Sequence, residues 1–297
     1  MSTVRLAKSG DDDFIQRIIQ HNFHGVVHST FNRTVNIQCL EHGDLYTVGC
    51  KEIDNAPNTL IIDLDCFEKV DIVVNDIVSS DHSNLSIVNK MSIAMDGVME
   101  WKCELPIYPT DRYVLNNNLS KMKDYIDIHG KNSAINRGFK GCSPYDSEMS
   151  RMLHEHTHLL VSELQNNELS NAMKHATSLI GLGPGLTPAG DDFLVGLFTV
   201  FNIGNSPCFS NKSFCEEVVS KAKNLTNDIS YTALEKAAVG KVRETIIDLM
   251  NALFRGNEDE LIMSLRKVLD IGSSSGTDIA LGIMAGLETN MTIGGKV

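Results

Sequence analysis

The sequence has little of what a secreted or membrane-spanning protein needs. Its seven cysteines contain no CxxC pair and are odd in number, so we expect reduced, buried thiols. They are Cys39, Cys50, Cys66, Cys103, Cys142, Cys208 and Cys215. No apolar run reaches the roughly 20 residues of a membrane-spanning helix. The first residues, MSTVRLAKSGDDD, lack the apolar centre of a signal peptide. These absences predict a cytoplasmic protein.

Positive charge is also scarce. The 297 residues carry 26 Lys and Arg against 38 Asp and Glu, which gives a formal net charge of −12. Nucleic-acid-binding surfaces and polybasic membrane anchors need clustered basic residues that attract phosphates. We therefore expect neither a nucleic acid nor a membrane as partner. This balance still leaves room for a local basic pocket that binds a small anion.

The residues that are present divide the chain near residue 110. Before that point, β-branched and alternating stretches predict strands in an antiparallel sheet or barrel, preceded by a helix over 12–22. The expected strands cover 26–40, 44–50, 58–64, 70–78 and 91–104. The two prolines of LPIYPT (105–110) indicate a boundary. We therefore expect a β-rich domain over 1–110.

Beyond this boundary, apolar residues recur at helical spacing. The expected helices cover 118–128, 147–165, 169–180, 192–202, 213–224, 230–254, 258–269 and 277–288. The helix over 192–202 is apolar almost all round and should be buried. The sequence thus predicts an α+β protein, in which an all-helical portion over 111–297 follows the β-rich portion.

One glycine-rich stretch, GLGPGLTPAGDDFLVG (181–196), has a partial second copy. AGDDFLVGLF (189–198) aligns without a gap on SGTDIALGIM (275–284). The alignment pairs Gly190 with Gly276, Asp192 with Asp278, and Gly196 with Gly282. Each copy follows an amphipathic helix and opens an apolar one. We therefore expect a pseudo-symmetric site where two helix N-termini converge, and a close helix crossing at the inner glycines.

The chemistry of such a site follows from its unpaired backbone amides. Glycine lets a ligand approach closely, and the first turn of a helix offers free N–H groups to an anion. The expected ligands of a small anionic substrate are Gly183, Gly185, Thr187, Gly190, Ser273, Ser274, Ser275 and Gly276. The expected catalytic groups are Asp191, Asp192 and Asp278. Aspartates at these positions can instead cap the helices or hold an amine or Mg²⁺. Tight turns and close packing alone are the structural alternative.

The same stretch resembles the central motif of the AllH-like subunits of oxamate carbamoyltransferase, a family of purine-catabolic gene clusters. Three further stretches are similar to that family: VHSTFNRTVNI (27–37), TNDISYTALEKAAVG (226–240) and IGSSSGTD (271–278). The resemblance implies a subunit that works with two larger, different subunits. Together they would transfer a carbamoyl group between carbamoyl phosphate and oxamate, giving oxalurate and phosphate. A carbamate kinase would then use the carbamoyl phosphate to make ATP.

Four more residues complete the expected substrate site. Arg33 can bind a carboxylate or phosphate through two parallel hydrogen bonds, and Asn36 lies on the same strand motif. Thr226 and Ser230 precede a long helix, where Ser230 is the expected N-cap. We expect no cofactor and no bound metal. The chain lacks the Ser-Thr-Arg-Thr-Arg-type phosphate loop of ordinary carbamoyltransferases, so a transfer here would need a different scaffold.

Two other functions stay open. The first is a non-catalytic assembly or regulatory subunit, whose glycine loops dock a partner. The second is a zinc hydrolase, because HEHTH (154–158) contains the H-E-x-x-H pattern of zinc peptidases. Val161 occupies the glycine position of the extended pattern, and Glu163 and Glu168 lie too close for the usual third ligand. A solvated helix face explains HEHTH better.

Overall fold

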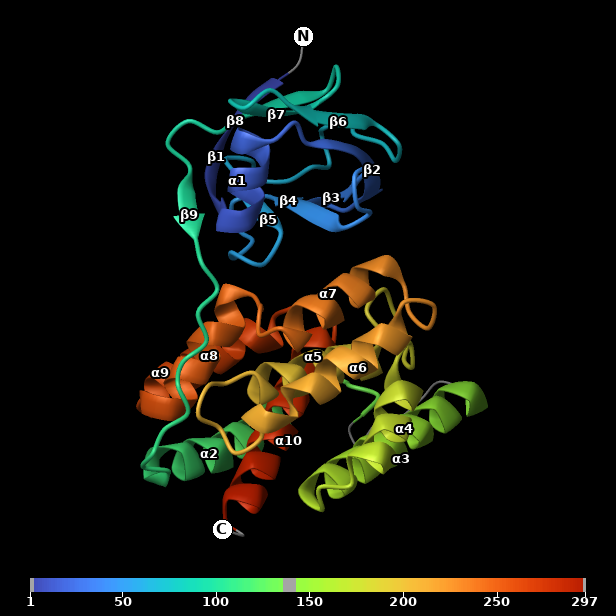
Figure 1. The fold of residues 1–297 in the computed structure, drawn as a ribbon, viewed down its shortest axis with the longest axis vertical. Coiled ribbons are helices and arrows are strands. Elements are labelled where there is room, and N and C mark those ends of the chain that lie inside the picture. Colours follow the sequence, from blue (N-terminus) through green and yellow to red (C-terminus); the bar gives the residue numbers. More distant parts are fainter. Residues whose placement is uncertain (1–2, 136–142, 296–297) are drawn as a thin grey trace. The chain divides into compact units, whose positions relative to one another are not determined.

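The computed structural model describes residues 3–135 and 143–295 (Figure 1). The chain forms two compact units, 1–104 and 105–297. The first is rich in strands and the second is helical, which confirms the predicted α+β class. Within the described ranges, no helix is both long and apolar enough to cross a membrane.

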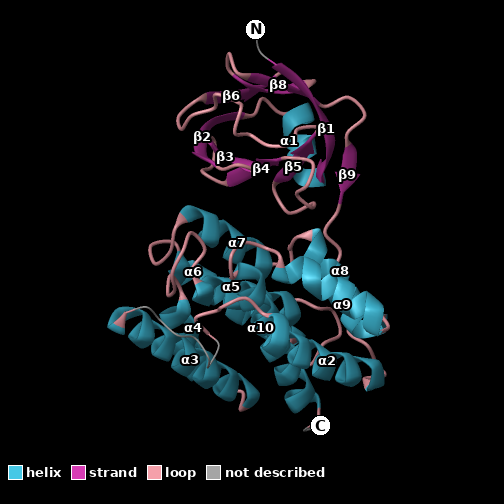
Figure 2. Cartoon of the chain, turned by 180° about the vertical axis from the view of Figure 1, so that it is seen from behind, coloured by secondary structure: helices cyan, strands magenta, loops and turns pink. Residues whose placement is uncertain are grey.

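The first unit is a closed sheet of mixed strands (Figure 2). Its strand order is β5-β4-β3-β2-β6-β7-β8-β1-β9, and it closes because β5 also pairs with β1. The strands are β1 (Thr3–Asp11), β2 (His24–Thr30), β3 (Thr34–Cys39), β4 (Leu45–Gly49), β5 (Thr59–Ile62), β6 (Ile77–Ser80), β7 (Asn84–Ile87), β8 (Met91–Ala94) and β9 (Met99–Trp101). Helix α1 (Asp12–Gln20) buries Phe14, Ile15 and Ile18 in the core of this barrel.

The expected antiparallel arrangement is wrong in part, because β1 runs parallel to β8 and β9, and β4 runs parallel to β5. The expected strand over 26–40 is a hairpin, β2 and β3. The strand over 91–104 is interrupted at Gly97, whose φ is 70°. Of the strand expected over 70–78, only the last two residues belong to a strand, β6, because Asn75 takes a left-handed φ of 73° just before it. Strands β1 and β7 were not expected.

The second unit packs its helices around one buried helix, α5. Its elements are α2 (Tyr113–His129), α3 (Pro144–Gln165), α4 (Leu169–Leu179), α5 (Ala189–Phe201), the 3-10 turn η1 (Phe209–Asn211), α6 (Lys212–Ala222), α7 (Asp228–Ala238), α8 (Glu244–Arg255), α9 (Glu258–Leu269) and α10 (Ser275–Gly294). All residues of α5 are buried, as its apolar sequence predicts. Helix α10 is its main neighbour.

Two expectations about the second unit are wrong. The single helix over 230–254 is two helices, α7 and α8, because Gly240 takes a φ of 77° between them. The N-cap of α7 is Asn227 and not Ser230, since the Asn227 side chain accepts hydrogen bonds from the amides of Ile229 and Ser230. Cys39, Cys50, Cys66, Cys208 and Cys215 are free thiols. Cys142 lies outside the described residues.

Candidate functional site

Helices α5 and α10 cross where each has an inner glycine. A Cβ atom on Gly196 would lie 2.1 Å from the carbonyl oxygen of Ile279 in α10. A Cβ atom on Gly282 would lie 2.0 Å from the carbonyl oxygen of Phe193 in α5. The two contacts are reciprocal, so any larger residue would force the backbones apart. This geometry confirms the predicted close crossing.

The two glycines at the helix starts are also matched. A Cβ atom on Gly190 would lie 2.0 Å from the carbonyl oxygen of Leu179, the last residue of α4. A Cβ atom on Gly276 would lie 1.8 Å from the carbonyl oxygen of Val268, near the end of α9. The sequence repeat is therefore a structural repeat of helix, loop and buried helix. Packing alone requires glycine at both positions.

Most amides at these helix starts are not free. Six of them donate hydrogen bonds within the chain, over 2.9–3.1 Å. The bonds run from Gly190 N to Leu182 O, from Asp191 N and Asp192 N to Pro188 O, from Gly276 N to Ile271 O, and from Thr277 N and Asp278 N to Ser274 O. The expectation of bare amides is therefore wrong at these positions. An anion would have to displace carbonyl groups that already satisfy them.

The repeat instead buries two carboxyl groups at the start of α5 and of α10. Asp192 is 7% exposed and Asp278 is 1% exposed, and one oxygen of each carboxyl is buried without a hydrogen-bond partner. Burial raises the pKa of Asp192 to about 7. Burial, with the added charge of Asp192, raises the pKa of Asp278 to about 8. At pH 7 Asp192 is about half protonated and Asp278 is mostly protonated, so the pair holds between one and two protons.

Hydroxyl groups surround the carboxyl pair. Thr187 and Ser275, one from each copy, are 2.8 Å apart, and their hydroxyls lower the pKa of Asp192 against the larger effect of burial. Ser133, in the loop after α2, donates a hydrogen bond to Asp278. Ser274 also favours the ionised form of Asp278. Sequence reasoning missed Ser133, because its stretch KNSAIN carries no motif that signals a site.

Asp191 has a separate set of partners. One carboxylate oxygen accepts from the Gly181 amide at 2.8 Å, and the other accepts from the Thr226 hydroxyl. The buried Ser230 hydroxyl lowers the pKa of Asp191, although it makes no well-formed hydrogen bond, and burial raises that pKa more strongly. Asp191 thus ties the glycine loop to the start of α7, and its oxygens are already occupied.

The other predicted residues divide by position. Gly183 and Gly185 take φ values of 133° and 98° in the loop before α5, and Ser273 is exposed in the loop before α10. Arg33 and Asn36 belong to the first unit, whereas the carboxyl groups of Asp192 and Asp278 belong to the second. Arg33 is exposed in the β2–β3 turn. In the barrel, the Asn36 side chain donates a hydrogen bond to the Ser29 hydroxyl and accepts one from the Thr47 hydroxyl.

The HEHTH stretch of α3 is solvated only in part, because Glu155 and His158 are exposed, His154 and His156 are half-buried, and Thr157 is buried. Glu155, the expected general base of a zinc hydrolase, forms an ion pair with Arg151 at 2.6 Å. His156, which is not one of the two histidines of the zinc pattern, lies beside His175 of α4, with 3.1 Å between their Nδ1 atoms. In the ranges that the structure covers, no three His, Cys, Asp or Glu side chains are placed to hold a metal ion.

Comparison with known families identifies the chain. The sequence model "AllH family N-terminal domain" matches residues 6–100, and the model "Oxamate carbamoyltransferase subunit AllH" matches residues 179–287. The first match covers the barrel, and the second covers both copies of the repeat. No solved structure matches this chain. The two family matches together span most of the sequence, and the chain therefore belongs to the AllH family of oxamate carbamoyltransferase subunits.

Proposed function

We propose that this subunit acts in carbamoyl transfer and that the Asp192–Asp278 pair handles the proton of the acceptor amide. In the transfer to oxamate, the amide nitrogen attacks the carbonyl carbon of carbamoyl phosphate. A C–N bond forms, the C–O bond to phosphate breaks, and the nitrogen loses a proton. A carboxylate whose pKa lies near the working pH is suited to accept that proton.

The observation that carries this proposal is the pair of buried carboxyl groups with different pKa values. Asp192, with a pKa of about 7, is the member that is ionised first and would serve as base. Asp278, with a pKa of about 8, keeps its proton longer and would donate a hydrogen bond to the developing negative charge. The reverse reaction, phosphorolysis of oxalurate, would use the same groups in opposite roles.

The hydroxyls of Thr187 and Ser275 are the proposed contacts to substrate. Both side chains are half-buried, whereas the carboxyl groups of Asp192 and Asp278 are buried. A ligand that reaches the pair would therefore meet these hydroxyls. They can donate to an oxygen of oxamate or carbamoyl phosphate in place of the occupied amides. Asp191, Thr226 and Ser230 would hold the loop in position.

The partners and the metabolic role that we propose for the subunit follow from its family. An oxamate carbamoyltransferase subunit works in a multi-subunit complex, and we propose two larger, different subunits as its partners. We also propose a cytoplasmic location and a role in allantoin and purine catabolism. The residues that bind phosphate would then come in part from the partner subunits.

A non-catalytic assembly role is the second candidate. It is favoured by the backbone packing at Gly190 and Gly276, which explains both glycines without any ligand. It is also favoured by the internal hydrogen bonds of the helix-start amides. In that case the repeat would serve only to hold α5 and α10 together.

The test is carbamoyl transfer by the complex reconstituted with Asp192→Asn or Asp278→Asn. We expect each substitution to lower the rate by about 10²–10⁴, the usual contribution of a general acid or base. The wild-type rate should rise as Asp192 ionises near pH 7 and fall as Asp278 loses its proton near pH 8. Asp278→Asn should remove the fall at high pH.

The matched control is Asp259→Asn, which changes an exposed aspartate in the first turn of α9, at the other end of this helix from the site. It should leave the rate within about twofold of wild type, as expected for a surface change away from the site. Size-exclusion chromatography would show whether each variant still assembles. Full activity of both pair variants in an intact complex would refute the catalytic role and favour the assembly role.

A further inference from the structure

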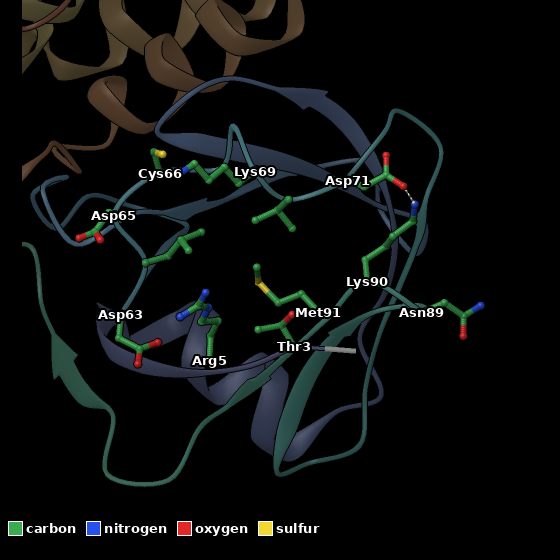
Figure 3. Close-up of a pocket in the computed structure, with 12 residues that line it drawn as sticks. Thr3, Arg5, Asp63, Asp65, Cys66, Lys69, Asp71, Asn89, Lys90 and Met91 are labelled. Atoms are coloured by element: carbon green, nitrogen blue, oxygen red, sulfur yellow. Dashed lines mark hydrogen bonds and ion pairs between the residues drawn. The ribbon is translucent and has the colours of Figure 1, made fainter. Parts of the chain in front are cut away.

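A pocket of about 630 Å³ opens on the barrel of the first unit (Figure 3). It lies between the start of β1, the segment after β5 and the β7–β8 turn. Its volume is within the usual range for sites that bind small molecules. The lining combines charged side chains with an apolar part formed by Leu64, Val70 and Met91.

The three carboxylates that line this pocket are already engaged. Asp63 accepts a hydrogen bond from the Leu6 amide at 2.7 Å. Asp65 forms an ion pair with Lys51, which lies outside the lining, and Asp71 forms one with Lys90 at 2.7 Å. Asp65 and Asp71 are therefore each paired with a lysine, whereas Asp63 is held by a backbone amide.

Two cations in the same lining form no ion pair within the described ranges, although the charge of Arg5 contributes to lowering the pKa of Asp65 after the larger effect of Lys51. Among the described residues, neither Arg5 nor Lys69 makes an ion pair or a hydrogen bond. The Nε atom of Arg5 is buried and unsatisfied. Figure 3 shows the Arg5 guanidinium directed into the pocket, while Asp65 points outward. A buried donor without an acceptor is costly, so this guanidinium is suited to a bound acceptor.

We propose that this pocket binds a small oxyanion, a carboxylate or phosphate, through Arg5 and Lys69. The guanidinium offers a planar fork of donors that matches two oxygens of such a group. The Thr3 hydroxyl, at the edge of the same lining, adds a donor. The apolar part would contact a short carbon skeleton. This site belongs to the first unit and is independent of the carboxyl pair on α5 and α10.

The test is calorimetric titration of the full chain with succinate and, separately, with inorganic phosphate. Sodium chloride at matched ionic strength controls for general screening of charge. We expect saturable binding of at least one probe and a rise in the unfolding temperature with its concentration. Preference for succinate would identify a carboxylate site, and preference for phosphate would identify a phosphate site.

Two variants and a matched control locate the binding. Arg5→Gln and Lys69→Gln should each weaken binding by about tenfold or more, since each removes a charge-assisted bond. Lys8→Gln removes one positive charge from an exposed position of the same strand, outside the lining, and should change affinity by less than twofold. Arg5→Lys keeps the charge without the fork and should fall between Arg5→Gln and wild type.

The unliganded Arg5→Gln variant should unfold close to the wild-type temperature, because Arg5 forms no ion pair with a described residue and its Nε atom has no hydrogen-bond partner among them, so only its longer-range attraction to Asp65 is lost. Failure of both probes to bind the wild-type chain would overturn the proposal. Equal binding by wild type and a folded Arg5→Gln variant would also overturn it. Neither result would affect the role proposed for Asp192 and Asp278, whose readout is carbamoyl transfer.

Discussion

Each half of the repeat buries one carboxyl group that would be ionised in water at neutral pH. The folded state raises the pKa of Asp192 from 3.8 to about 7 and that of Asp278 from 3.8 to about 8. Between these values the folded chain binds more protons than the unfolded chain. The contribution of the pair to stability is therefore largest near pH 4, falls as pH rises from there, and is fully lost once pH has passed about 8.

We predict a measurable slope for this loss. For each carboxyl group, the free energy of unfolding should fall by up to about 1.4 kcal/mol per pH unit between its unfolded and folded pKa. Urea denaturation at pH 5, 6.5 and 8 would measure it. An Asp192→Asn/Asp278→Asn double variant should have a flatter profile. Parallel profiles for wild type and double variant would show that the pair does not carry the effect.

The sequence located these two residues but not their surroundings. The aligned motif identified Asp192 and Asp278 because an aspartate before an apolar helix stands out in both copies. It could not show that neighbouring carbonyls occupy the helix-start amides, because loop conformation decides that. Ser133 also stayed hidden, since its contact with Asp278 joins positions 145 residues apart.

At the scale of elements, the crossing of α5 and α10 gives a second prediction. Gly196→Ala or Gly282→Ala would place a Cβ atom about 2 Å from a backbone oxygen of the other helix. Each should lower the free energy of unfolding by at least about 2 kcal/mol, although alanine favours a helix by about 1 kcal/mol. Chemical denaturation would measure the change.

Gly204→Ala is the control for this experiment. A Cβ atom on Gly204 would meet nothing within 4 Å, so stability should change by less than about 0.5 kcal/mol. Wild-type stability of the Gly282→Ala variant would contradict the close crossing. A variant that is destabilised but still assembles would separate this packing role from partner binding.

The errors in the predicted strands share a physical cause, because some apolar residues of the first unit are exposed. Strand β1 exposes Val4 and Leu6 and buries Ala7 and Gly10, so its apolar pattern does not mark its core face. The apolar stretch before β6 was expected to be a strand, but it forms a turn in which Val73 and Val74 are each 52% exposed. The helices were easier to predict, since their spacing of apolar residues matches the buried faces.

At the scale of the molecule, we predict that the two units fold independently. The barrel core draws its residues from 7–95 alone. The helical unit surrounds α5 with its own buried residues. Fragments 1–104 and 105–297 should each give a cooperative thermal transition, followed by circular dichroism. An unfolded fragment beside a folded full chain would contradict this.

The position of the boundary can be tested in the same way. Tyr108 is 5% exposed, stacks edge-on to Phe254 and bonds through its amide to Gly204. A fragment that begins at 111, the boundary expected from the prolines, would lose this anchor. It should therefore melt at a lower temperature than the fragment that begins at 105. Equal melting would place the boundary at 110.

Closure of the barrel has to wait for synthesis of a late part of the unit. The first strand pairs its residues Thr3–Leu6 with Met91–Ala94, so the partner of each of these residues is synthesised 88 residues later. At a translation rate of about 5–20 residues per second, that wait is roughly 4–18 s. During it, the growing chain presents an unpaired strand edge that the finished barrel conceals. Neighbouring nascent chains on one messenger RNA can pair through that edge, which makes this interval the one in which a chaperone has most effect.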